Sequence, residues 1–252
     1  MCSITKVSNF ERTIDNLSSR TMQNDIVITP DTFEMKFGVP KYMRNIFLAT
    51  LQRRTRIPEK FSYSKMKTVY FDDNTNSNYF DSRDGQLYRR KYRFREYINP
   101  ETSGAYYSLE IKIRFDKKTN KIKKLIYKRL PKGYKIVTFK KLINDFEKVL
   151  NCPLSFFKKE LPVNELFPDT MICYERFRFD DYYQDARYNL DINIVTLPCG
   201  RLGTLDNGIY FDYDVFEIKS RKPLFLPSFL KGLDIEPLSV SKFIGAKELL
   251  LF

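Results

Sequence analysis

Alternation between basic and aromatic residues at positions 89–95 is the feature that most constrains how this chain can fold. The segment reads RRKYRFR, and neighbouring side chains of a β-strand point to opposite faces. One face of such a strand carries Arg89, Lys91, Arg93 and Arg95, and the other carries Tyr92 and Phe94. An antiparallel strand with one solvated face shows the same pattern. This segment alone therefore leaves open whether the basic face is exposed or enclosed.

Five other segments share the design of an apolar face opposite a face with charged or polar residues. They span residues 33–37, 109–114, 173–179, 187–194 and 215–219. Residues 67–72 predict a further strand, and the spacing of apolar residues predicts helices within 40–51, 138–149, 227–233 and 239–250. Thr138 and Ser239 are the expected helix caps. Residues 72–85 are interpreted as a polar connector and 117–135 as a lysine-rich loop or hairpin, which together give an α+β protein.

Two architectures fit these strands. Either the charged face of a sheet is solvated, or the sheet closes into an antiparallel β-barrel with a charged lumen and helices packed on its apolar outside. The motif E-x-K occurs on three predicted strands, at 34–36, 110–112 and 217–219. Cations in a lumen repel one another unless a polyanion or metal is bound, and carboxylates offer oxygen ligands for Mg²⁺ or Mn²⁺. The repeated motif therefore favours the barrel and makes Glu34, Glu110 and Glu217 candidate metal ligands.

Charge and cysteine content narrow the kinds of partner. The chain has 44 Lys and Arg against 31 Asp and Glu, a net charge of +13 that suits a polyanion. It has no histidine and no C-x-x-C pair among its four cysteines, so a zinc site is not expected. Neither a signal peptide nor an apolar run of ~18 to 20 residues is recognisable. We therefore expect a soluble, cytoplasmic protein with free thiols, and the sequence is compatible with a membrane-protein partner.

Short motifs occur in a characteristic order along the chain. They lie at 34–36, 70–72, 84–85, 91–95, 110–112, 174–176, 187–193, 216–219 and 241–243. From about Thr32 to the C-terminus this order resembles VTC domains, the catalytic domains of vacuolar transporter chaperone polyphosphate polymerases in the triphosphate tunnel metalloenzyme (CYTH-like) superfamily. The resemblance implies an eight-stranded antiparallel β-barrel, the triphosphate tunnel, as one domain over residues 26–252. Residues 1–25 are interpreted as a polar N-terminal arm.

The resemblance also implies a function, the synthesis of polyphosphate from the γ-phosphate of ATP with Mn²⁺ or Mg²⁺ as cofactor. ATP and inorganic polyphosphate are then the expected partners, and nucleic acid is not, because the basic face lines a lumen. The implied catalytic, phosphate-binding residues are Lys36, Arg93, Arg95, Lys112, Arg176, Arg187, Lys219 and Lys242. Lys91 and Lys128 would add substrate binding, and Glu217 would bind the metal together with the candidates Glu34 and Glu110.

Two positions depart from the family pattern. Thr32 stands where tunnel hydrolases carry the first Glu of E-x-E-x-K, which disfavours a metal-dependent triphosphatase. Ser239 stands where a lysine is often found three residues before Lys242. A non-catalytic, polyphosphate-binding accessory domain remains an alternative to the polymerase, as does the triphosphatase, while nucleic-acid binding rests on charge alone. The remaining strand arginines, Arg89, Arg114 and Arg178, are interpreted as solvated.

Overall fold

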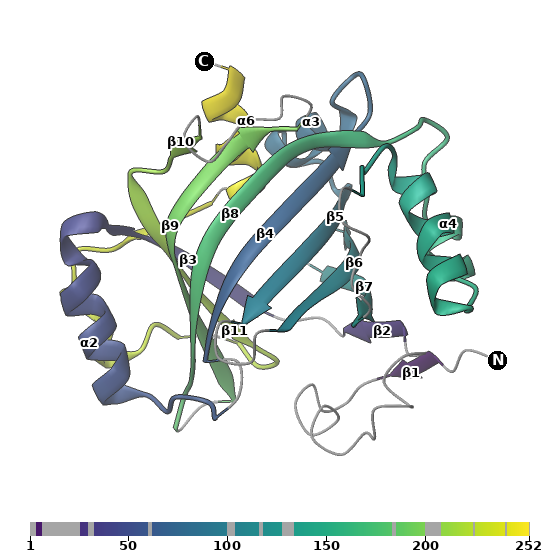
Figure 1. Ribbon diagram of the computed structural model, residues 1–252. Coiled ribbons are helices and arrows are strands. Elements are labelled where there is room, and N and C mark those ends of the chain that lie inside the picture. Colours follow the sequence, from purple (N-terminus) through teal and green to yellow (C-terminus); the bar gives the residue numbers. More distant parts are fainter. Residues whose placement is uncertain are drawn as a thin grey trace.

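One strongly curved β-sheet organises the chain (Figure 1). The structure is a computed structural model and describes residues 4–6, 26–29, 33–59, 62–99, 104–115, 118–127, 134–182, 185–199, 208–223, 225–239 and 241–251. The strands are β1 (Ile4–Lys6), β2 (Ile26–Thr29), β3 (Phe33–Pro40), β4 (Tyr63–Asp72), β5 (Tyr88–Asn99), β6 (Gly104–Phe115), β7 (Lys118–Ile126), β8 (Phe167–Asp180), β9 (Ala186–Pro198), β10 (Ile209–Tyr210), β11 (Tyr213–Ser220) and β12 (Glu236–Pro237). The helices are α2 (Arg44–Arg54), α3 (Ser77–Arg83), α4 (Phe139–Leu150), α5 (Ser155–Lys159) and α6 (Lys242–Leu251), with 3₁₀ turns η1 (Lys41–Met43) and η3 (Ser228–Leu230).

The strands follow the order β1-β2-β7-β6-β5-β4-β8-β9-β11-β3-β12, with β10 beside β9. Pairing is antiparallel except between β1 and β2. Within the described residues the two ends of this order do not pair, so the predicted closed barrel of eight strands is not confirmed. The sheet nevertheless curves so strongly that strands far apart in this order face each other. The evidence is a 3.1 Å hydrogen bond that Lys112 on β6 donates to Glu34 on β3. The α+β class is confirmed, and the concave face is a half-enclosed space.

The apolar alternate positions of β5 and β6 point away from the concave face and are buried under α4. Tyr92, Phe94 and Ile111 belong to one core cluster with Phe139 and Phe146 of this helix. In Figure 1, α4 lies on the side of the sheet formed by β5, β6 and β7. The aromatic face predicted for residues 89–95 is therefore a core face, because burying these rings removes a large apolar area from water.

A second core lies on the outside of the opposite half of the sheet, under α2. Tyr188 of β9 and Ile218 of β11 are buried there with Phe47 of the helix. The rings of Phe47 and Phe216 meet edge to face, with centroids 5.0 Å apart. Ile46 of the same helix is 58% exposed, although its spacing from Met43 is that of a shared helical face. The two cores therefore cover the outer face of the curved sheet, one near each end of the strand order.

One end of the concave face is covered by α6, which packs with α3 (Figure 1). Phe243 of α6 stacks on Tyr70 of β4 with ring centroids 4.8 Å apart. Tyr79 of α3 and Tyr174 of β8 belong to the same buried cluster. This aromatic cluster places the first residue of α6, Lys242, above the charged part of the concave face.

Several local predictions need correction. The segment 72–85 is not only a connector, since it contains α3, whose backbone N–H groups at Asn78 and Tyr79 donate to the Asp72 carboxylate. The lysine-rich segment 117–135, predicted as a loop or hairpin, contains β7, which forms an antiparallel hairpin with β6, so the hairpin alternative is confirmed. Thr138 caps α4 as predicted, by accepting a hydrogen bond from the backbone N–H of Lys141. Near α6 it is Ser241, not Ser239, that accepts a backbone hydrogen bond, from Ile244.

The cysteines meet the prediction of free thiols only in part. Cys173 and Cys199 are free, whereas Cys152 is disulfide-bonded. Among the described residues, no helix combines the length and apolar character that a membrane span requires.

The core under α4 gives a first testable prediction. Phe146 is 1% exposed and packs against Phe94 with ring centroids 5.7 Å apart, so Phe146→Ala removes a large buried group and leaves a cavity. We expect the free energy of unfolding to fall by about 3–5 kcal/mol, measured by urea denaturation. Lys148→Ala on the exposed side of α4 is the control and should change it by less than about 0.5 kcal/mol. Equal effects of the two changes would contradict the packing described here.

Candidate functional site on the concave face

Basic side chains line the concave face and outnumber the acidic ones there. They come from alternate positions of β3, β5, β6, β7, β8, β9 and β11 and from the start of α6. The basic residues are Lys36, Lys91, Arg93, Arg95, Lys112, Lys121, Lys123, Arg176, Arg178, Arg187, Lys219 and Lys242. The acidic residues are Glu34, Glu110, Asp191 and Glu217. The described carboxylates of this face therefore cannot neutralise its cations.

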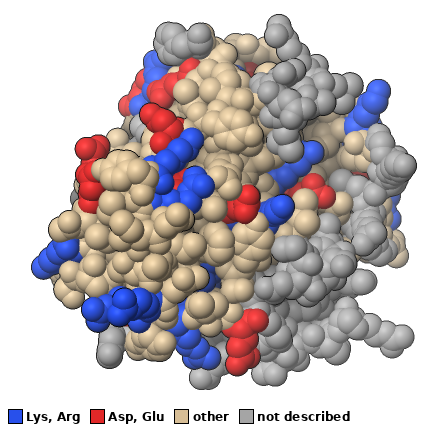
Figure 2. All heavy atoms as spheres, turned by 60° about the vertical axis from the view of Figure 1, so that its left-hand side comes forward, with Lys and Arg blue, Asp and Glu red and all other residues tan. Residues whose placement is uncertain are grey.

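The excess positive charge of the chain is not displayed as one patch on the outer face seen in Figure 2. There, Lys and Arg side chains lie singly or in small groups among acidic and uncharged residues. A nucleic-acid-binding face is expected to gather its basic residues into a patch or stripe. The face seen in Figure 2 therefore shows no such patch, in contrast to the basic residues gathered on the concave face.

Glu110 is the centre of one ionic cluster. Its carboxylate accepts hydrogen bonds from Arg93 Nε at 2.7 Å and from Ser108 Oγ at 2.8 Å, and Lys123 Nζ lies 3.7 Å away. Burial alone would raise the pKa of Glu110, but Arg93 and the neighbouring lysines lower it well below its usual range. The carboxylate is therefore ionised, and it holds the Arg93 guanidinium in place on the concave face.

A second cluster brings residues of all three E-x-K motifs together. Lys219 Nζ lies 3.2 Å from Glu34 Oε1 and 3.3 Å from Glu217 Oε2. Glu34 also meets Lys112 at 3.1 Å and Lys36 at 3.7 Å. Burial would raise the pKa of both carboxyl groups, but the lysines around them lower it. Strands β3, β6 and β11 thus meet through one network of alternating charges.

Asp191 forms the third cluster, and the sequence analysis did not single it out. It accepts hydrogen bonds from Arg176 Nε at 2.5 Å and Nη2 at 2.7 Å, a bidentate pair. Its other contact is Lys242 Nζ at 2.7 Å, from the start of α6. Asp191 is fully buried, and despite this burial its cationic partners lower its pKa well below the usual range. It therefore positions two predicted phosphate-binding residues at once.

Other cations of the concave face are less well compensated. Lys91 Nζ donates to Ser241 Oγ at 2.7 Å, and burial together with Lys112, Lys36, Arg89 and Arg93 lowers its pKa well below the usual range. Burial also lowers the pKa of Lys121 to about 7. A lowered lysine pKa means that the charged form is disfavoured where it stands. A bound polyanion would reverse this effect, because it would supply the missing negative charge.

Three predicted phosphate-binding residues remain, and they lie in different parts of the chain. Arg95 is buried and donates to Thr68 Oγ1 at 3.0 Å. Arg187 lies at the end of β9 and donates to Asp180 Oδ1 at 3.3 Å. Lys128 lies outside the described residues.

Sequence reasoning missed four charged residues of this face: Asp191, Lys121, Lys123 and Arg178. Arg178 was interpreted as solvated, but it donates to Ser64 Oγ at 3.0 Å on the concave face. Lys121 and Lys123 were assigned to a solvated loop, and their K-x-K spacing was the available indication of a strand. For Asp191 the indication was its place in the alternating segment 187–194.

The carboxylates only partly fit a divalent metal. Within the described residues no group of three or more acidic or cysteine side chains could hold an ion. Glu34 and Glu217 converge on Lys219, whereas Glu110 is engaged by Arg93 and does not join them. Magnesium commonly needs only one or two carboxylates when phosphates supply further oxygens. The Glu34 and Glu217 pair therefore fits such an ion, and the prediction that Glu110 shares in binding it is not supported by this geometry.

The family assignment agrees with this arrangement. Residues 27–251 match the family model of the VTC domain. The chain belongs to the VTC domain family. The match covers nearly all of the chain, and it includes every strand that lines the concave face of this VTC domain. No significant match was found among the curated proteins.

Two solved structures are similar to this VTC domain at low scores. One is the crystal structure of a Bacillus halodurans protein named as a candidate adenylate cyclase, with 14% identity, a TM-score of 0.43, and coverage of 77% of this chain and 82% of that one. The other is the Schizosaccharomyces pombe Mediator head module, with 9% identity, a TM-score of 0.40, and coverage of 82% and 100%. Scores this low carry no argument about function.

The Asp191 cluster gives a pH-dependent prediction. Because the folded-state pKa of Asp191 lies below its ordinary value of 3.8, its contribution to stability is present above about pH 4 and is lost as the pH falls toward the folded-state pKa. Asp191→Asn should lower the free energy of unfolding at pH 7 by on the order of 3 kcal/mol, since it leaves two buried cations without their partner. It should also flatten the loss of stability in acid.

Chemical denaturation between pH 7 and pH 2 measures both effects. Asp185→Asn is the matched control because Asp185 is exposed on the same β8–β9 side of the molecule. If Asp191→Asn and Asp185→Asn gave the same pH profile, Asp191 would not be the residue that holds Arg176 and Lys242.

Proposed function

We propose that this VTC domain is a polyphosphate polymerase that transfers the γ-phosphate of ATP to a growing polyphosphate chain. The observation that carries the proposal is the surplus of cations on the concave face, which includes lysines whose pKa is lowered by desolvation. A run of phosphates would supply the anions that this surface lacks. The family assignment supports the same class of substrate.

The chemistry asks little of the protein beyond positioning. An anionic terminal oxygen of the acceptor chain attacks the γ-phosphorus, a new P–O bond forms, the bond from the γ-phosphorus to its β,γ-bridging oxygen breaks, and ADP leaves with that electron pair. The attacking oxygen is already ionised, so no strong base is required. Charge on the equatorial oxygens of the transition state is stabilised by fixed cations. Arg93 and Arg176, each held by a buried carboxylate, are such cations and are preorganised before substrate binds.

A divalent cation would be held by Glu34 and Glu217 together with phosphate oxygens. When bound, it would neutralise phosphate charge and orient the reacting groups. Lys219 occupies the position between these two carboxylates, so it must release at least one of them for the ion to bind. Its ammonium would then be free to contact phosphate.

A non-catalytic polyphosphate-binding domain is the second candidate. It is favoured by the same Lys219 bridge, since every described carboxylate of the concave face is engaged by a cation. A surface of that kind can bind a polyanion without supporting chemistry. ADP release on incubation with ATP and Mn²⁺ distinguishes the two functions, and orthophosphate from the first turnover would instead indicate a triphosphatase.

Residues on opposite faces of β5 allow a controlled test of whether the concave face binds phosphate. Arg93 lies on the concave face with Glu110, whereas Arg90 lies on the outside, 3.0 Å from Glu160. Arg93→Ala should lower the rate of ADP and polyphosphate formation about ten-fold or more, because a charge-assisted hydrogen bond to phosphate is lost. Arg90→Ala removes the same net charge and should have little effect. Equal losses would indicate a diffuse electrostatic effect in place of a defined binding face.

The metal assignment is tested at Glu217. Glu217→Gln keeps the size of the side chain but removes the charge that a divalent ion requires, so activity should fall at least ten-fold and should not recover at high Mn²⁺. Far-ultraviolet circular dichroism should remain unchanged. Glu160→Gln on the outer face is the control. Full activity of Glu217→Gln at saturating Mn²⁺ would show that Glu217 is not a ligand.

A further inference from the structure

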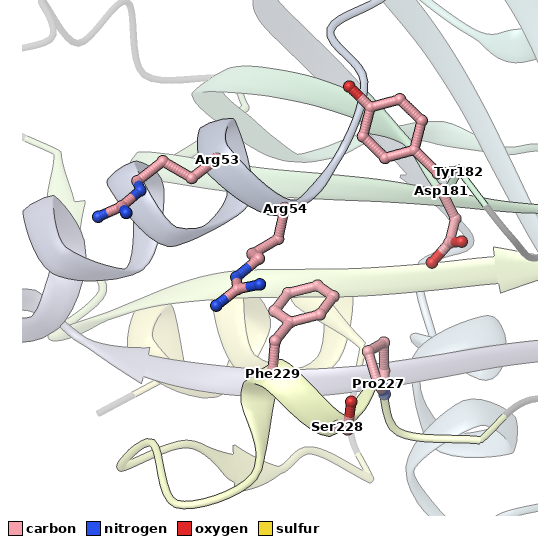
Figure 3. Close-up of a pocket in the computed structure, with 7 residues that line it drawn as sticks. All are labelled: Arg53, Arg54, Asp181, Tyr182, Pro227, Ser228 and Phe229. Carbon is pink, nitrogen blue, oxygen red and sulfur yellow. The ribbon is translucent and has the colours of Figure 1, made fainter.

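A pocket of about 330 Å³ lies on the outside of the sheet, at the end of α2 and away from the concave face. Figure 3 shows that it is bounded by the last turn of α2, by the start of the β8–β9 connection and by the turn at η3. Its lining residues are Arg53, Arg54, Asp181, Tyr182, Pro227, Ser228 and Phe229. In this view the guanidinium group of Arg54 and the ring of Phe229 face the same space.

The charges of this pocket are unequal. Asp181, which accepts a hydrogen bond from the Tyr188 hydroxyl, supplies one carboxylate against two arginines. In the described part of the chain, the side chains of Arg53 and Arg54 make no hydrogen bond and no ion pair.

The C-terminus of a helix favours cations, which accounts for arginines in the last turn of α2. It does not account for the adjoining pocket, whose lining includes Tyr182 and Phe229. In Figure 3 the Arg54 guanidinium is directed toward this space, whereas the Arg53 side chain extends the other way from the edge of the pocket. A guanidinium beside a cavity with a serine hydroxyl and a second nearby positive charge suits a phosphate group.

The pocket is connected to the concave face through the next arginine of the chain. Arg56 exchanges two backbone hydrogen bonds with Asp180, at 2.9 and 2.8 Å, and so lies at the end of β8. The Asp180 carboxylate in turn accepts a hydrogen bond from Arg187 of the concave face. Arg187, Arg56, Arg54 and Arg53 therefore all lie near this end of β8, with Asp180 and Asp181 among them. A chain of phosphates that leaves the concave face at this end would pass close to these four arginines.

We propose that Arg53 and Arg54 form an outer phosphoanion site, separate from the concave face. The phosphate group has two possible sources: a polyphosphate chain emerging past Arg187, or a free short phosphate compound. The first source rests on the proposed function, and the second does not. The pocket is at the small end of the range for ligand sites, which suits a short stretch of chain or a small anion.

The test is isothermal titration of the whole chain in the absence of ATP and metal, so that it does not depend on catalysis. Long-chain polyphosphate and inorganic tripolyphosphate are the two probes. Arg53→Ala/Arg54→Ala should weaken long-chain binding about ten-fold or more, because a guanidinium contact to phosphate and a second nearby positive charge are lost. Arg53→Lys/Arg54→Lys keeps the charge but not the planar fork, and should lose less. Thermal unfolding of both variants checks that the fold is kept.

Tripolyphosphate distinguishes the two sources. In one outcome, the original protein and the alanine variant each bind one tripolyphosphate per chain while the variant binds long-chain polyphosphate more weakly. That result assigns the pocket to the emerging polyphosphate chain. If the original protein binds two tripolyphosphate molecules per chain and the alanine variant binds one, the pocket binds free phosphate compounds as well. If the original protein binds no long-chain polyphosphate, the proposed function fails, and the tripolyphosphate stoichiometry alone decides the pocket.

Lys140→Ala/Lys148→Ala on α4 is the matched control, since it also removes two exposed positive charges from a helix. Figure 1 places α4 at the opposite end of the curved sheet from α2. Affinity and stoichiometry that are unchanged by Arg53→Ala/Arg54→Ala would overturn the proposal. Equal weakening by the two double variants would overturn it too, because it would reflect net charge alone.

Discussion

The pairing of the cations of the concave face with a smaller number of carboxylates is the constraint on which the site depends. Lys112 of β6 reaches Glu34 of β3 across the concave face, and Glu34 is linked through Lys219 to Glu217 of β11. Such contacts bring together strands that are distant in the sheet order. A buried ion pair costs desolvation, so an arrangement in which cations remain in surplus is stable only because the face stays partly open to solvent and to anions.

Function and folding use opposite faces of the same strands. On the outside, aromatic and aliphatic residues such as Tyr92 and Ile218 pack under α4 and α2, which supplies the apolar burial. On the inside, the alternate residues carry the charges of the concave face. The carboxylates Glu110 and Asp191 fix Arg93 and Arg176 in defined orientations. Preorganised cations of this kind avoid reorganisation when a phosphate chain binds.

The outer core and the division into two faces could be predicted from alternation alone, because a period of two fixes which side chains share a face. Whether the sheet closes into a barrel could not be predicted in this way, since closure depends on the curvature accumulated over many strands. Lys121 and Lys123 were missed because a run of lysines in sequence resembles a solvated loop. Only the pairing of β7 with β6 shows that Lys123 faces Glu110.

What the sequence by itself determined is therefore the identity and spacing of the charged residues, their separation from the aromatic face, and the order of motifs that marks the family. Only the tertiary structure decided which charges meet. Glu110 and Glu217 belong to identical E-x-K motifs, yet one is held by Arg93 and the other lies beside Lys219. A motif fixes contacts along one strand, whereas the electrostatic partner of a buried carboxylate is set by strands that arrive from elsewhere in the chain.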